Sequence, residues 1–529
     1  MKNLKLISYK KNLIFYISIL FIFSISINQY YGNLGLCPID SFWFFNSGYD
    51  TLNGFYPFKD YWTIAGPFIT FIQALFFKVF GVSWFSYVFH ASIFNFFISI
   101  FTFYTFYKFK LDIKYCFLYA LLVAVIAYPS SGTPYVDHHA SIMSIISLLM
   151  FILAIKTNSK IYWFFIPITL FLSFLTKQTP TGNIFLIIIF LSFIYFIFDF
   201  QIKKILLGLM GSTFIVTLFL IVLFITQIPF ENFYEQYISY PLSMGKVRVE
   251  HFLFPLEFSR IILRFKLIHI PLLFMIFISI KEIKNDFKYL KSANFLIVLA
   301  LIASSFALIA HQLMTINGMF IFFIIPILIG FAHIFFVDHF KKENNFLYVF
   351  IIFGICTTLY YGYKYINKRD FMDLKNANLS QHIDAKIIDK KLSGLNWISC
   401  YYPNNPKKEI SNLIEAINLI KKDSRKKSIV TEYQFISVIL SSYDYAPTQV
   451  WFINHVVNQS KNSKFFRSYK KLLTKQIKEN KIEIVYLIKP FWETDKIYEK
   501  GLNKDCYNKV KISEILDVYT LKDCNDLNR

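Results

Sequence analysis

Residues 32–81 read GNLGLCPIDSFWFFNSGYDTLNGFYPFKDYWTIAGPFITFIQALFFKVFG, and the rest of the chain is interpreted around them. The stretch follows a long apolar run and carries Asp40, Asp50 and Asp60 among aromatic residues, glycines and prolines. Charge at a membrane is costly and is usually retained at a functional site. Irregular backbone is tolerated there only where it is buried in protein or lines a cavity. The stretch therefore predicts a first extramembrane loop that holds a site.

The composition is that of a membrane protein. Of 529 residues, 56% are hydrophobic and 20% aromatic, and the mean hydropathy is +0.47. A soluble chain of this size would be near zero or negative on that scale, so we predict an α-helical polytopic membrane protein. The net charge of +22 does not indicate a nucleic-acid partner. More than half of the Lys and Arg residues follow Tyr363, and most of the others lie in short loops between apolar runs.

About eleven apolar runs are long enough to cross a bilayer, at about 20 residues per crossing with some slack for shorter runs. They lie roughly at 11–29, 86–107, 114–129, 138–155, 161–176, 181–199, 204–227, 266–280, 293–311, 318–337 and 346–363. The run 66–80 is interrupted by Gln73 and Lys78. We interpret it as part of a segment of interfacial helices at about 41–80.

The distribution of lysines orients these spans. With the N-terminus in the cytoplasm, every cytoplasmic loop carries two to four lysines, while the longer outer segments hold only seven Lys and Arg residues together. Positive residues favour the cytoplasmic side, and an odd number of spans places the C-terminus outside. The acids Asp40, Asp60 and Asp137 and the base Lys177 then share the outer face with several histidines. This convergence on one face predicts a site there.

The composition changes near Asn367. ISNLIEAINLIKKD, residues 410–423, predicts an amphipathic helix, and KKSIVTEYQF and KIEIVYLIKP, residues 426–435 and 481–490, predict buried strands. Alternating helix and strand indicate a small α/β domain. We predict a transmembrane domain at 1–366 and an extracytoplasmic α/β domain at 367–529. Cys506 and Cys524 could pair in such a compartment, which would leave Cys400 free.

Asp40 and Asp60 are the candidate catalytic residues. Asp40, in CPIDSFWFF, is interpreted either as a general base for an acceptor hydroxyl or as a helix N-cap. Asp60, in GFYPFKDYW, is interpreted either as a second active-site acid beside a stacking surface of Tyr61 and Trp62, or as a turn cap or a partner of Lys59.

Other charged residues of the outer face are candidates for binding a phosphate or the substrate. Lys177, in FLTKQTPTGN, is predicted on the outer face, although positive residues favour the cytoplasmic side. Either a donor phosphate or snorkelling to lipid headgroups explains this position. Asp137 and His138, in PYVDHH, suit a substrate site, a metal or a helix cap. The remaining candidates, each also explicable as ordinary loop polarity, are Lys246, Arg248, His251 and His311.

Cofactor motifs are missing from the sequence. It contains no P-loop, GxGxxG, HExxH or CxxC pair, which gives no support for ATP-driven or nicotinamide chemistry. We predict no cofactor. A divalent metal is compatible with the Asp137 region but is not predicted.

The stretch GYDTLNGFYPFKDYWTIAGPFITFIQALFFKVFG resembles the first-loop motif of the GT-C superfamily of polytopic glycosyltransferases. The groups it resembles are the bacterial protein-mannosyltransferase-like proteins and the lipid A aminoarabinose transferases. FLSFLTKQ, residues 171–178, and the α/β tail also look like this superfamily. The resemblance covers about the first 200 residues well and the rest by topology.

The resemblance implies inverting transfer of a sugar from a polyprenyl-phosphate donor at the outer face of a bacterial cytoplasmic membrane. Asp40 and Asp60 match the acidic positions of the loop, and Lys177 matches a lysine that binds the donor phosphate. Many relatives carry Asp-Glu at the first position, whereas Ser41 follows Asp40 here. This difference leaves open which aspartate is the base, and whether this member is active. The implied partners are the donor, membrane lipid, and a glycan, lipid or protein acceptor.

Two other functions remain open. A transporter or flippase of lipid-linked sugars would place charges along the membrane midplane and show pseudo-repeats, neither of which is seen in this sequence. A non-catalytic scaffold in cell-envelope polysaccharide assembly would tolerate loss of both Asp40 and Asp60.

Overall fold

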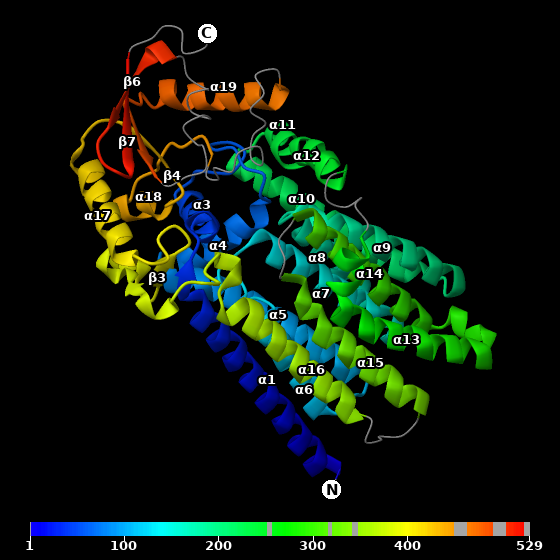
Figure 1. Ribbon diagram of the computed structural model, residues 1–529. Helices are drawn as coiled ribbons and strands as arrows, with labels where there is room; N and C mark the ends of the chain where they lie inside the picture. Colours follow the sequence, from blue (N-terminus) through cyan, green and yellow to red (C-terminus); the bar gives the residue numbers. More distant parts are fainter. Residues whose placement is uncertain are drawn as a thin grey trace. The chain divides into compact units, whose positions relative to one another are not determined.

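The computed structural model describes residues 2–250, 257–315, 320–340, 347–448, 463–489 and 504–522 (Figure 1). The chain divides into two compact units. The first comprises Met1–Gly32, Val88–Leu220 and Arg248–Phe371, and the second comprises Asn33–Tyr87, Ile221–Val247 and Met372–Arg529. The domain boundary expected at residue 366/367 stays a prediction. The second compact unit contains the first loop as well as the tail.

The first unit is built of long helices. Its helices are α1 (Lys2–Gly32), α5 (Trp84–Lys108), α6 (Ile113–Ile126), α7 (Val136–Thr157), α8 (Ile161–Phe174), α9 (Gln178–Phe198), α10 (Ile202–Thr226), α13 (Lys266–Asn285), α14 (Ala293–Thr315), α15 (Ile324–Phe340) and α16 (Leu347–Tyr361). Each of the predicted spans falls on one of these helices. Among the described residues, eight helices are long and apolar enough to cross a membrane.

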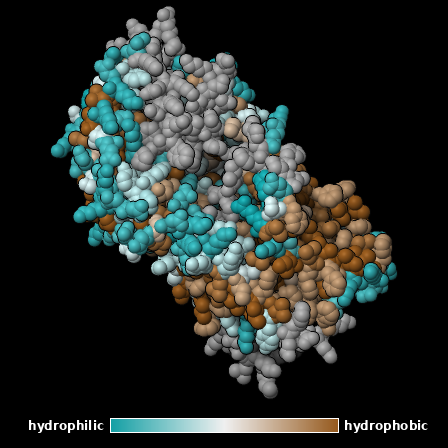
Figure 2. Space-filling model, in the orientation of Figure 1, coloured by the Kyte–Doolittle hydropathy of each residue, from teal (hydrophilic) through white to brown (hydrophobic). Residues whose placement is uncertain are grey.

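The other three helices are shorter or more polar. α6 and α8 have 14 residues each, fewer than the about 20 that a crossing requires. α13 has 20 residues but carries Lys281, Glu282 and Lys284 at its end. Hydrophobic side chains gather on much of the helical surface in the view of Figure 2. On α9, for example, Leu186, Phe190 and Phe193 are 63–64% exposed. The chain is a multi-pass membrane protein.

Polar side chains inside the apolar helices join neighbouring spans of the first unit. The side-chain amide of Asn28 in α1 donates to the carbonyl of Gly132 at 3.1 Å. The amide of Asn95 in α5 donates to the carbonyls of Ser24 in α1 and Ala124 in α6, at 3.1 and 2.9 Å. Hydrogen bonds between helices stabilise membrane proteins, because lipid offers no alternative partner. These amides therefore fix α1, α5 and α6 against one another.

Gly132, in the loop before α7, lies too close to α1 to carry a side chain. Its φ is +73°, and a Cβ there would lie 2.4 Å from the Cα of Gly32. We expect Gly132→Ala to lower the free energy of unfolding, by about 1–2 kcal/mol for the left-handed backbone and by about 1–3 kcal/mol more for overpacking. Thermal unfolding in detergent, followed by tryptophan fluorescence, measures the loss.

Gly182→Ala is the matched control for that experiment. Gly182 lies in helix α9 and a Cβ added there would meet nothing within 4 Å. Alanine is the better helix former by about 1 kcal/mol, so this variant should unfold at the wild-type temperature or above. Equal unfolding temperatures for the two alanine variants would show that the close approach at Gly132 is unimportant.

The second unit joins the first loop to the tail. Its elements are β1 (Leu34–Leu36), α2 (Pro38–Ser41), α3 (Trp43–Leu52), α4 (Pro67–Phe80), α11 (Phe230–Phe233), α12 (Tyr240–Arg248), β2 (Ile383–Asp384), β3 (Asn396–Ser399), α17 (Pro406–Lys422), β4 (Lys427–Thr431), α18 (Phe435–Leu440), α19 (Lys464–Glu479), β5 (Ile484–Ile488), β6 (Tyr507–Lys511) and β7 (Leu516–Leu521). The predicted tail helix is α17, and the two predicted tail strands are β4 and β5.

Two sheets organise this unit in the described part of the chain. One has the strand order β4-β5-β7-β6, with β4 parallel to β5 and the other pairs antiparallel. The other has the order β1-β3-β2, with β1 of the first loop parallel to β3 of the tail. Aromatic packing accompanies this pairing, since the ring of Phe42 lies 5.8 Å from Trp397 and 4.7 Å from Phe435. The first loop and the tail therefore share one core.

Candidate functional site

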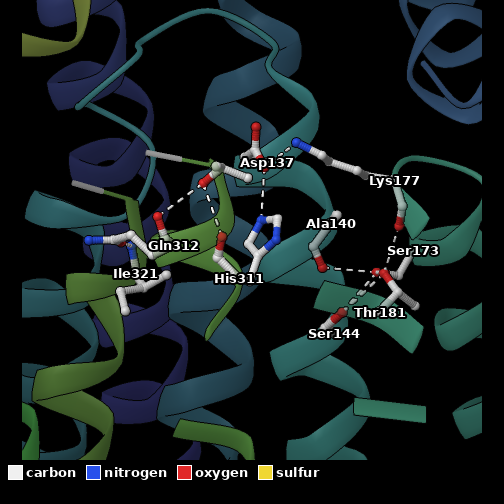
Figure 3. Close-up of polar contacts among 10 residues, drawn as sticks. Asp137, Ala140, Ser144, Ser173, Lys177, Thr181, His311, Gln312 and Ile321 are labelled. Carbon is white, nitrogen blue, oxygen red and sulfur yellow. Dashed lines mark hydrogen bonds and ion pairs between the residues drawn. The ribbon is translucent and has the colours of Figure 1, made fainter. Parts of the chain in front are cut away.

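Three of the predicted site residues meet in the first unit (Figure 3). One carboxylate oxygen of Asp137 accepts a hydrogen bond from Nζ of Lys177 at 2.6 Å and from Nε2 of His311 at 2.8 Å. The side chains of Asp137 and His311 are 3% and 0% exposed, whereas that of Lys177 is 23% exposed. An ionised carboxylate only accepts hydrogen bonds, so Nε2 of His311 carries a proton. In this arrangement a buried acid binds a partly exposed cation.

The helices place these residues at the ends of spans. Asp137 lies in the first turn of α7, Lys177 is the N-cap residue of α9, and His311 lies near the end of α14. A helix N-terminus favours a carboxylate, and a C-terminus favours an imidazole that can be charged. We call Asp137, Lys177 and His311 the trio. The helix termini thus stabilise its two buried members, Asp137 and His311. Lys177 is bonded to an internal acid, which differs from a lysine snorkelling toward headgroups.

Hydroxyl groups fix the connection that carries Lys177 (Figure 3). Oγ of Ser173 donates to the carbonyl of Ala140 at 2.8 Å and lies 2.7 Å from Oγ1 of Thr181 and 3.0 Å from Oγ of Ser144. Oγ1 of Thr181 donates to the carbonyl of Lys177 at 3.0 Å. The network ties α7, α8 and α9 together beside the lysine. Sequence analysis missed it, although the run SFLTKQTPTG is rich in hydroxyls for a membrane segment.

A buried arginine holds the loop that leads into α7. Arg369 is fully buried and donates to the carbonyls of Pro129, Ser130 and Ser131 at 2.9, 3.2 and 3.1 Å. A buried charge is tolerated when its donors are satisfied in this way. Sequence analysis missed this role, because Arg369 was grouped with the basic tail. Its signal was an arginine a few residues after the last predicted span.

His138 and His139 point to different partners, as expected for neighbours about 100° apart on a helix. Nε2 of His138 lies 2.6 Å from Oγ of Ser130. Nε2 of His139 lies 3.0 Å from Nε2 of His90. The ring of Phe320 lies 5.7 Å from that of His138 and 5.5 Å from that of His311. His138 therefore adjoins the trio through an aromatic ring and is bonded to the α6–α7 loop.

Asp40 lies in the second unit, half-buried in the first turn of α2. Its backbone N–H donates to the carbonyl of Cys37 at 3.1 Å. The N-cap residues of α2 and α3 are Cys37 and Phe42, so Asp40 caps neither helix. The interpretation of Asp40 as an N-cap is therefore wrong, and its role as a base is a prediction.

Asp60 closes a turn in the same unit. Its Oδ2 accepts a hydrogen bond from the backbone N–H of Tyr56 at 2.7 Å. Its carbonyl accepts hydrogen bonds from the hydroxyl of Tyr443, at 3.1 Å, and from the side-chain amide of Gln476. Partial burial raises the pKa of Asp60 above the usual value. The turn-cap interpretation is confirmed, and an additional catalytic role is a prediction.

A further pair of buried carboxylates lies in the second unit. Asp50 and Asp444 are 1% and 5% exposed. The side-chain amide of Asn46 donates to Oδ2 of Asp50 at 3.2 Å and also hydrogen-bonds Asp444. Burial raises the pKa of Asp444 to about 7. Sequence analysis had noted Asp50 without assigning it a role, and it missed Asp444, because only the folded tail brings residue 444 beside the first loop.

The remaining candidates lie in the segment 246–251. Lys246 is exposed on α12, of which Arg248 is the last residue. His251 lies outside the described residues. Within the part of the chain that the structure describes, no group of three or more His, Cys, Asp or Glu side chains is arranged to hold a metal ion.

Comparisons with known proteins add a distant structural likeness. No protein-family model and no curated protein sequence matches the chain. The chain is similar to the Archaeoglobus fulgidus oligosaccharyltransferase tethered to an acceptor peptide with the NVT sequon, at 13% identity and a TM-score of 0.44, over 90% of this chain and 69% of that one. The apo form of that enzyme gives 12% identity and a TM-score of 0.43 over the same shares. Its complex with Zn and sulfate gives 13% identity and a TM-score of 0.35, over 89% of this chain and 67% of that one. Because these TM-scores are below 0.5, we draw no conclusion about activity from the likeness.

Removal of the buried acid should destabilise the first unit. Asp137→Ala leaves Lys177 and the buried His311 without the carboxylate that both bind. Loss of one partner from a buried ion pair costs about 3–5 kcal/mol, and the partial exposure of Lys177 puts our expectation at the lower end. The apparent unfolding temperature in detergent measures the loss. Asp338→Ala, at an exposed site on α15, should have little effect, and equal losses in both variants would contradict a structural role for the trio.

Proposed function

We propose that this protein is a membrane glycosyltransferase that transfers a sugar from a polyprenyl-phosphate donor to a hydroxyl acceptor with inversion. The observation that carries the proposal is the ion pair of Lys177 with the buried Asp137. An ammonium group has three N–H donors, and the structure gives one of them to Asp137. The remaining donors suit the oxygens of a phosphate, and the side chain keeps partial exposure.

The acid in this pair has a specific physical effect. Asp137, which is itself held by His311, restricts the position of the lysine, so less side-chain freedom is lost when a phosphate binds. Asp137 also offsets the lysine charge, which stabilises the cation at this partly buried position before the donor arrives. Because the ammonium group is held in place, it is a preorganised donor to the negative charge that develops on a leaving phosphate.

The proposed reaction needs a base and a stabilised leaving group. An aspartate of the first loop, Asp40 or Asp60, takes the proton of the acceptor hydroxyl. The acceptor oxygen forms a bond to the anomeric carbon, and the bond from that carbon to the phosphate oxygen breaks. The polyprenyl phosphate leaves with the bonding electrons, and Lys177 stabilises its charge. No nucleotide, metal or other cofactor takes part in the proposed steps.

The proposal also assigns a location and partners. The protein is placed in a bacterial cytoplasmic membrane, and the lysine distribution supports a cytoplasmic N-terminus and an extracytoplasmic C-terminus. The donor enters from the outer leaflet, and the acceptor is a glycan, lipid or protein of the cell envelope. Lys246, Arg248 and His251 are proposed to assist in donor binding.

The test uses the full chain in lipid nanodiscs with a radiolabelled polyprenyl-phosphate hexose and a membrane extract as the source of acceptor. We expect label to leave the donor only with intact protein, and to do so equally in the presence of EDTA. Vesicles with donor in one leaflet provide the contrasting measurement. Movement of intact donor between leaflets without release of sugar would overturn the proposal in favour of a transporter.

A further inference from the structure

Two cysteines far apart in the sequence lie directly after the ends of neighbouring strands of the second unit, Cys37 after β1 and Cys400 after β3. β1 runs parallel to β3, with Leu36 opposite Ser399. The backbone N–H of Cys400 donates to the carbonyl of Leu36 at 3.3 Å. Cys37 and Cys400 are the residues that directly follow this register pair, so the sheet brings them side by side.

The geometry of this pair suits a disulfide. Neighbouring strands lie about 4.7–4.9 Å apart, within the Cα separation of about 4.4–6.8 Å that disulfides require. Both cysteines are free in the structure. A hydrogen bond to Cys400 together with burial raises the pKa of the Cys37 thiol, which agrees with this placement.

The location of the pair favours oxidation. Cys506, in the same unit, is disulfide-bonded, and disulfides persist in oxidising compartments. Cys400 is half-buried, whereas Cys37 is 6% exposed. An external disulfide therefore has access to Cys400 first, with Cys37 behind it.

We propose that Cys37 and Cys400 form a redox-active dithiol that an external disulfide, such as glutathione disulfide or a protein disulfide, converts into a structural disulfide. The Cys400 thiolate attacks one sulfur of the external disulfide and releases one thiol. The Cys37 sulfur, after losing its proton, then attacks the Cys400 sulfur of the mixed disulfide, and the second thiol leaves. In sum, the two protein thiols lose two hydrogens and the external disulfide becomes two thiols.

The bond would act on the turn that presents Asp40. The carbonyl of Cys37 accepts hydrogen bonds from the backbone N–H groups of Asp40 and Ser41, at 3.1 and 2.8 Å, and its own N–H donates to Oγ of Ser41 at 3.1 Å. A disulfide to Cys400 ties this turn covalently to strand β3 of the tail. It also closes a very long loop, which constrains the unfolded chain strongly. This inference does not depend on the proposed transfer activity.

The experiment is peptide mapping of the purified full chain in detergent. The protein is incubated with glutathione disulfide, quenched in acid, alkylated and digested without reductant. We expect one linked species that contains the Cys37 and Cys400 peptides and is two hydrogens lighter than their sum. It should separate on reduction and be lost in Cys37→Ser and in Cys400→Ser. Cys356→Ser removes the exposed free cysteine of α16 and should retain the species.

A second readout guards against misfolded variants. The oxidised wild type should unfold at a higher temperature than the reduced wild type, while Cys37→Ser should show no such difference. Recovery of Cys37 and Cys400 as separately alkylated peptides, or only as glutathione adducts, from natively folded wild type would overturn the proposal. A link from either cysteine to a different cysteine would do the same.

Discussion

We expect Lys177→Met to reduce sugar transfer by about 10²–10³-fold, the loss that follows removal of one preorganised donor to developing negative charge. The methionine side chain keeps much of the volume of lysine but provides no N–H donor. Lys177→Arg keeps the charge and should retain intermediate activity, since the guanidinium has a different shape. Release of label from the polyprenyl-phosphate donor measures all three proteins. Lys78→Met, at an exposed site on α4, is the matched control and should transfer at the wild-type rate.

A double variant separates catalysis from folding at this position. Lys177→Met alone leaves the buried Asp137 without its cation, so a loss of activity could follow from instability. Asp137→Asn/Lys177→Met removes both charges together and should unfold near the wild-type temperature. We expect it to remain inactive. Recovery of transfer in the double variant would show that Lys177 serves only to pair with Asp137.

We expect one of the two first-loop substitutions, Asp40→Asn or Asp60→Asn, to reduce transfer by about 10²–10⁴-fold, the usual contribution of a general base. Asparagine keeps the shape of aspartate, and at position 60 its side-chain oxygen can still accept the hydrogen bond from Tyr56. Asp384→Asn, at an exposed site in the same unit, is the matched control. Wild-type rates in both first-loop variants would contradict the mechanism and favour a transporter or a scaffold.

The pH profile identifies the base. A general base acts only when ionised, so the rate should rise with pH through its pKa. Burial raises the pKa of Asp60, so if Asp60 is the base, the half-maximal rate lies above the ordinary aspartate pKa of about 3.9. In that case Asp60→Asn should remove this limb of the profile, and Asp40→Asn should leave it in place.

Local sequence patterns predicted most of the fold. Each apolar run fell on a helix, because burial in lipid depends on the hydrophobicity of a continuous segment. The tail helix α17 and strands β4 and β5 also followed from periodicity. The count of eleven crossings was less well determined, since α6 and α8 have 14 residues each. Length decides whether a helix crosses, and helix ends depend on caps and turns that apolar runs do not show.

The sequence was less informative about which distant residues contact one another. Lys177 was singled out because it violated the charge rule, and Asp137 and His311 because they shared its predicted face. That they bind one another required the fold, since residues 137, 177 and 311 meet only when α7, α9 and α14 pack. Arg369 and Asp444 were missed for the same reason, because their partners are remote in sequence.

The sequence by itself determined that this is a membrane protein with long apolar helices, an acidic first loop and an α/β tail. These features arise from local hydrophobicity and periodicity, which the chain carries whatever its tertiary structure. Only the tertiary structure decided that the first loop and the tail share a sheet through β1 and β3, and that Lys177 is held by a buried acid. Strand pairing and buried ion pairs depend on contacts between distant residues, and a single sequence does not record which distant residues meet.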